Sequence, residues 1–193
     1  SLDALAAQAP GTHRVQDRTQ APAPAATDAF HNAPDTDPSL PANQAWAAGI
    51  RERAQGSTLG ADAVAAATLR DAAALDAVIE TGIAANDAWR SLSGDERAEI
   101  LHRAGHELEV RRAELMEVAA SEAGKTLDQS DPEVSEAIDF AHYYAERARD
   151  LDRIDGATAV PSRLIVVTPP WNFPIAIPAG STLAALASGA SVI

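Results

Sequence analysis

The fold is decided by an apolar run and the turn after it, which read Leu164-Ile165-Val166-Val167-Thr168-Pro169-Pro170-Trp171-Asn172-Phe173-Pro174. Four consecutive apolar residues predict a short strand that is covered on both faces, as in a parallel sheet. The prolines that follow cannot continue this strand. Residues 182–187 then suit a helix, Gly189 its end, and residues 190–193 the start of a second strand. We therefore expect an α/β fold, of which the chain holds an incomplete first βαβ unit, and we expect the chain to be a fragment.

Helical patterns precede the strand. From about Asp71, apolar residues recur at three- and four-residue steps, which is typical of one face of a helix. Residues 93–96 match a capping box that begins a second helix, whose pattern extends to Gly124. Asp131 and Pro132 predict the start of a further helix, with aspartate as its cap and proline in its first turn, running to about residue 150.

The N-terminal third of the chain differs in composition. Residues 1–41 hold half of the prolines and show no sustained period, which is typical of a linker or tail. Residues 42–70 are interpreted as a bridging segment that is polar around residues 51–59. The predicted organisation is a proline-rich linker at 1–41, a bridge at 42–70 and a truncated domain at 71–193.

Charge and composition exclude several classes of partner. The 15 basic and 28 acidic residues give a net charge of −13, which opposes binding to nucleic acids and anionic membranes. The sequence has no cysteine, so these residues supply neither a disulfide nor a cysteine nucleophile. Residues 164–193 carry no charge and are long enough to cross a bilayer, but their prolines and glycines favour a buried strand, turn and helix. We expect a cytoplasmic protein without a secretion signal or a transmembrane segment.

Two weaker patterns do not predict sites. Gly124-Lys125-Thr126 imitates the end of a phosphate-binding loop, but Ala119 replaces its first glycine and the context is a helix end. His102 and His106 share a helical face without an evident third ligand, so no metal site is expected.

The turn at residues 168–174 lies where a buried strand ends and a helix follows, which is where open α/β sheets bind ligands. Its prolines restrict the backbone, Trp171 supplies a rigid wall, and the amide of Asn172 is a hydrogen-bond donor able to face a developing oxyanion. The alternative is a rigid turn in which Asn172 only caps the next helix.

The turn also carries a family resemblance. Pro170-Trp171-Asn172-Phe173-Pro174 after an apolar strand resembles the signature of the aldehyde dehydrogenase superfamily. Upstream, residues 122–127, 136–140 and 143–145 resemble the branch that oxidises glutamate semialdehyde, in order and in spacing. Residues 30–50 are similar to the interdomain segment of proline utilization A proteins, which are bifunctional proline-catabolic enzymes.

The resemblance implies roles for eight residues. In the superfamily, the asparagine that matches Asn172 donates its amide to the substrate oxygen. The residues that match the strand end beside the nicotinamide are Thr168, Pro169, Pro170 and Trp171. Pro169 departs from the small or aliphatic residue expected there. The resemblance implies that the residues near the aldehyde substrate are Phe173, Glu136 and Phe140, although the face that holds Glu136 and Phe140 is equally typical of ordinary packing.

The implied fold is the N-terminal helices and first βαβ unit of a Rossmann-like cofactor domain. The implied activity is NAD-dependent oxidation of glutamate semialdehyde, the open form of 1-pyrroline-5-carboxylate, to glutamate, by a homo-oligomer. The catalytic cysteine would lie beyond Ile193, so the fragment alone is expected to be inactive. FAD would be involved only if a proline dehydrogenase domain precedes Ser1. Alternatives are an aldehyde dehydrogenase of other specificity and a non-catalytic acidic helical module.

Overall fold

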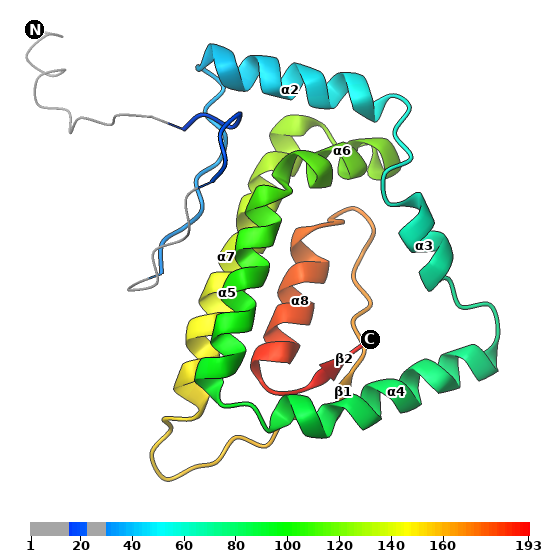
Figure 1. The fold of residues 1–193 in the computed structure, drawn as a ribbon, viewed down its shortest axis with the longest axis vertical. Coiled ribbons are helices and arrows are strands. Elements are labelled where there is room, and N and C mark those ends of the chain that lie inside the picture. The colour runs from blue at the N-terminus through cyan, green and yellow to red at the C-terminus, as the bar shows by residue number, and fades with distance from the viewer. Residues whose placement is uncertain (1–15, 23–29) are drawn as a thin grey trace, which may run out of the picture.

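The computed structural model describes residues 16–22 and 30–193, which form a mostly helical structure with a two-stranded parallel sheet. The elements are α2 (Pro41–Ala54), α3 (Ala61–Ala67), α4 (Ala72–Arg90), α5 (Gly94–Val110), α6 (Arg112–Ala123), α7 (Leu127–Leu151), β1 (Leu164–Ile165), α8 (Ala176–Ala187) and β2 (Ser191–Val192). In Figure 1, α5 and α7 run side by side with α8 next to them, α2 and α6 lie at one end, and α4 lies beside the strands.

α7 is the helix around which the core is arranged. Its buried apolar residues recur at three- and four-residue steps, so they form one continuous face. Near its start, Val134 and Ile138 pack with Ile50 of α2 and Met116 of α6. Further along, small buried alanines of α7 pack against Leu101 of α5 and against α8. Because alanine side chains are short, the three helices can approach closely there.

The predicted βαβ unit is confirmed. Leu164 pairs with Ser191 and Ile165 with Val192 in parallel register, and α8 is the crossover helix. The amide of Val167 also donates to the carbonyl of Ile193 at 2.8 Å. The strand is shorter and less covered than expected, since Val166 is 62% exposed. α4 and α8 contact the strands, and no described element covers Val166.

Several predicted helix ends are confirmed. Asp71 caps α4 by accepting the amide of Ala74, and Ser93 and Glu96 form the capping box of α5. α6 ends at Gly124, whose φ of 66° is left-handed. The single helix expected between residues 93 and 124 is instead two helices, because the backbone leaves helical geometry at Arg111 (φ −95°, ψ 13°).

The predicted start of α7 at Asp131 is wrong. The helix begins at Leu127, and Pro132 lies inside it. As the sixth residue of the helix, Pro132 lies past the first turn, so it removes the hydrogen bond that an amide at this position would donate to the carbonyl of Asp128. The Asp131 carboxylate does not cap the helix, because it accepts the backbone amide of Thr36 at 2.5 Å and pairs with Arg112.

The bridging segment contains two helices that the sequence analysis did not predict. α2 begins with Pro41 in its first turn, a position that proline favours. It buries Ile50 completely in the core cluster that also holds Met116 and Val134. The more exposed α3 follows after a short turn.

The described part of the predicted linker is bound to the helices. The amide of Ala33 donates to Asp139 at 2.6 Å, Phe30 meets Tyr143 edge to face, and Arg18 pairs with Glu109. The rest of the predicted linker, residues 1–15 and 23–29, lies outside the described residues. Among the helices that the structure describes, none has both the length and the apolar character needed to span a membrane.

Arg112 joins three helices through its buried guanidinium group. It donates from α6 to the carbonyl and carboxylate of Asp131 at 3.0 and 2.9 Å and to the hydroxyl of Ser135 at 3.0 Å, both on α7. It also donates to Glu109 of α5 at 2.7 Å. Its side chain is 2% exposed, so its charge is compensated within the protein.

We expect Arg112→Met to lower the free energy of unfolding by about 3 to 5 kcal/mol, because it removes the buried cation that pairs with Asp131, while Glu109 keeps its pair with Arg18. Urea unfolding measures this loss. Arg111→Met is the matched control, since the side chain of the neighbouring Arg111 is 65% exposed and pairs with Glu107, which is equally exposed. The control should change stability by less than about 0.5 kcal/mol. Equal unfolding midpoints for the two variants would contradict this role for Arg112.

Candidate functional site

The turn that follows β1 is exposed, but it rests on a buried base. All six residues from Thr168 to Phe173 are exposed, with Trp171 at 77% and Phe173 at 42%. Ile175 and Ala176, where α8 begins, are buried. The side chain of Asn172 therefore lies at the protein surface, a few residues from the core.

Glu133 of α7 holds the base of this turn. Its Oε1 accepts the backbone amides of Ile175 at 2.7 Å and Ala176 at 3.1 Å. The first turn of α8 contains no acidic residue, and Ile175 has no side-chain cap of its own. Glu133 thus supplies from another helix the cap and the negative charge that a helix N-terminus favours.

Lys125 completes this group. Its ammonium lies 2.5 Å from Oε2 of Glu133 and 4.3 Å from the centre of the Phe173 ring. The Glu133 side chain is 2% exposed and that of Lys125 is 11% exposed, so solvent screens the pair weakly. The same cation therefore neutralises the carboxylate that caps α8 and contacts the aromatic residue next to Asn172.

Phe140 packs where α7 and α8 come closest. A methyl group added at Gly180 of α8 would lie 2.8 Å from the Phe140 ring, so glycine is needed for this approach. Phe140 also stacks with Tyr144, whose ring is nearly parallel at a centroid distance of 5.8 Å. Phe140 is partly buried, so packing is one of its roles.

Glu136 lies on α7 between Glu133 and Phe140. It follows Glu133 by three residues and precedes Phe140 by four, which places it on the strip of α7 beside the first turns of α8. Unlike Glu133, it is exposed. Glu133 and Phe140 both contact α8, and Glu136 lies between them along the sequence of α7.

Sequence reasoning missed Lys125 and Glu133. Glu133 binds amides that lie 42 and 43 residues further along the chain, and no local pattern reveals such a pairing. The short motif Gly124-Lys125-Thr126 does attract notice, and the structure gives Lys125 a carboxylate and an aromatic ring as partners.

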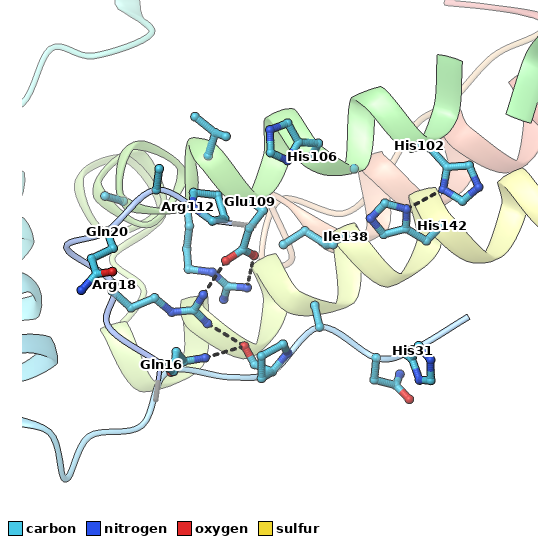
Figure 2. A pocket seen from close by; sticks show the side chains of 18 of the residues that line it. Gln16, Arg18, Gln20, His31, His102, His106, Glu109, Arg112, Ile138 and His142 are labelled. Atoms are coloured by element: carbon cyan, nitrogen blue, oxygen red, sulfur yellow. Dashed lines mark hydrogen bonds and ion pairs between the residues drawn. The ribbon is translucent and has the colours of Figure 1, made fainter. Parts of the chain in front are cut away.

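A separate cavity of about 480 Å³ lies between the N-terminal segment and the α5–α7 pair (Figure 2). Arg18, Glu109 and Arg112 line one end, and His102 and His142 line the other, with their Nδ1 atoms 2.7 Å apart. Burial lowers the pKa of His142, and the charge of His102 lowers it further. The residues predicted for the functional site do not line this cavity.

Within residues 16–22 and 30–193, no group of three or more histidine, aspartate and glutamate side chains is arranged to hold a metal ion. The turn instead offers an exposed amide donor, aromatic walls and a nearby carboxylate. Such a set can bind a polar small molecule and stabilise negative charge on an oxygen atom.

Comparisons with known proteins agree with this arrangement. The aldehyde dehydrogenase family model matches residues 55–193. The chain is 36% identical over 127 residues to an alpha-ketoglutarate semialdehyde dehydrogenase of Haloferax volcanii, covering 61% of this chain and 26% of that protein. It is 34% identical over 125 residues to 1-pyrroline-5-carboxylate dehydrogenase 2 of Bacillus subtilis, covering 60% and 24%.

The fold matches as well. The structure of Proline Utilization A (PutA) from Corynebacterium freiburgense superimposes with a TM-score of 0.69 at 38% identity, covering 83% of this chain and 15% of that one. The chain thus spans about a quarter or less of the length of these relatives. The resemblance inferred from the proline-rich turn and the upstream helices is confirmed, and the chain belongs to the aldehyde dehydrogenase family, whose members bind NAD(P).

Proposed function

We propose that the chain is part of an enzyme that oxidises L-glutamate γ-semialdehyde, the open form of 1-pyrroline-5-carboxylate, to glutamate with NAD in proline catabolism. The observation that carries this proposal is the exposed Asn172 on a turn whose base is held by Glu133 at the start of α8. The similarity to a 1-pyrroline-5-carboxylate dehydrogenase and to PutA supports the substrate class. Cytoplasmic location and homo-oligomeric assembly are part of the same proposal.

The residues before Asn172 fit one side of a nicotinamide. Thr168, Pro169, Pro170 and Trp171 are exposed and follow the carboxyl end of β1, where open α/β sheets bind ligands. When bound, NAD would supply the hydride acceptor of the reaction. The prolines limit the backbone to few conformations, so the surface offered to the cofactor needs little ordering on binding.

In the proposed reaction, Asn172 donates its side-chain amide to the aldehyde oxygen while negative charge develops on it. Phe173 and Phe140 provide apolar walls for the carbon chain of the substrate. A cysteine thiolate is the nucleophile in this family, and residues 1–193 contain no cysteine. We therefore place the nucleophile outside these residues and expect residues 1–193 alone to form no NADH from aldehydes.

A second candidate substrate is α-ketoglutarate semialdehyde, which is favoured by the similarity to the Haloferax volcanii enzyme. The two aldehydes share a carboxylate end and differ at one carbon, which bears an ammonium group in glutamate semialdehyde and a keto group in the other. The exposed carboxylate of Glu136 can attract the ammonium group but not the keto group. This difference makes the two candidates separable.

We expect Asn172→Ala to lower the rate of the chemical step by roughly a hundredfold to a thousandfold in the complete enzyme, because one oxyanion donor is lost. NAD affinity should change little. Single-turnover hydride transfer, followed by NADH absorbance, measures the effect. Asn32→Ala is the control, since Asn32 is an exposed asparagine that binds Asp139 away from the turn. A folded Asn172→Ala enzyme with wild-type hydride transfer would refute the proposed role.

We expect Glu136→Gln to reduce kcat/KM for glutamate semialdehyde by about tenfold, or about 1.4 kcal/mol, while kcat/KM for α-ketoglutarate semialdehyde and pentanal changes by less than about twofold. The substitution keeps the shape of the side chain and removes its charge. Glu99→Gln, at an exposed carboxylate of α5, controls for the loss of surface charge. Equal losses for the three aldehydes would mean that Glu136 does not recognise the ammonium group.

A further inference from the structure

We propose that Lys125 and Glu133 are positioning residues for Asn172, so that an ion pair outside the reacting groups sets the direction of the oxyanion donor. This inference rests on the proposed function, because it concerns how the donor of that reaction is oriented. Neither side chain is expected to touch the substrate or the cofactor. Their effect on the reaction would pass through the turn between β1 and α8.

The first step of the argument is the division of the Glu133 carboxylate between two partners. Oε1 accepts the amides of Ile175 and Ala176, and Oε2 accepts from Lys125. A carboxylate that binds three donors in this way has little rotational freedom. Because Glu133 projects from the long and well-packed α7, it connects the start of α8 to the core that α7 shares with α2 and α6.

The second step concerns charge. A carboxylate that is 2% exposed is costly to bury unless it is paired and hydrogen-bonded. The ammonium of Lys125 and the amides at the start of α8 together provide this compensation. Without Lys125, Glu133 would gain by moving toward solvent, and the amides of Ile175 and Ala176 would lose their acceptor.

The third step connects the pair to Asn172. Lys125 lies 4.3 Å from the ring of Phe173, and Glu133 binds the amide of Ile175. The pair therefore holds the side chain of the residue directly after Asn172 and the backbone two residues further on. On the other side, Pro169 and Pro170 restrict the backbone. With both flanks restrained, the exposed amide of Asn172 is directed by contacts that lie beneath it.

This role predicts more than a loss of stability. Small errors in the position of a catalytic group lower a rate strongly, by up to about a hundredfold for about 1 Å. A residue that acts only by orienting Asn172 should have no effect once the Asn172 amide is absent. A residue that merely stabilises the protein should have the same effect with and without that amide.

The test uses the complete enzyme and compares wild type, Lys125→Met, Asn172→Ala and the double variant. Methionine keeps the unbranched apolar stem of lysine and removes its charge. Arg53→Met is the matched control, because Arg53 also pairs with a largely buried carboxylate, that of Glu117, at 2.7 Å between α2 and α6. Single-turnover hydride transfer is measured for each variant, and a thermal melt shows that each is folded.

We expect Lys125→Met to slow hydride transfer by about tenfold or more in the wild-type background and by less than about twofold in the Asn172→Ala background. Arg53→Met should change the rate by less than about twofold in both. If Lys125→Met has no effect, or slows both backgrounds equally, the positioning role is wrong although the proposed function stands. If Asn172→Ala itself has the wild-type rate, both proposals fail.

Discussion

The shared carboxylate of Glu133 is the contact on which the arrangement of the turn depends. It joins α7 to the first amides of α8 at 2.7 and 3.1 Å and to Lys125 at 2.5 Å. The start of α8 needs such a partner, because it has no acidic residue or side-chain cap of its own. An exposed turn can therefore follow a short strand and still be held at its base.

The N-terminal part of α7 also holds a buried cation, because Asp131 and Ser135 accept hydrogen bonds from the guanidinium of Arg112. The two polar groups lie within the first turns of the same helix, and the helix's small apolar residues pack against α5 and α8 further along. α7 thus connects the helical part of the chain to the βαβ unit. The position of the candidate site follows from the packing of this one helix.

Local signals predicted much of the fold. The capping box at Ser93, the end of α6 at Gly124 and the strand that begins at Leu164 depend on residues within a few positions of one another. The structure also places Asn172 and Phe173 on the exposed turn that their motif indicates.

Contacts between distant residues account for what the sequence analysis missed. Glu133 acts on amides more than forty residues away. The sequence predicts Asp131 as a helix cap, but its carboxylate instead pairs with Arg112 and accepts the amide of Thr36. α2 was overlooked because its amphipathic character is weak and its burial depends on Met116 and Val134 of other helices.

Hydrogen exchange at the start of α8 tests the central claim most directly, because it reports on the amides that Glu133 binds. In the complete enzyme, Glu133→Gln should speed exchange at Ile175 and Ala176 by about tenfold, since a bond to a charged acceptor is replaced by a weaker neutral one. Exchange at Ile193, whose amide donates to Ile165 at 3.0 Å, should stay unchanged. Unchanged exchange at Ile175 and Ala176 in the folded variant would contradict the claim that this carboxylate holds the turn.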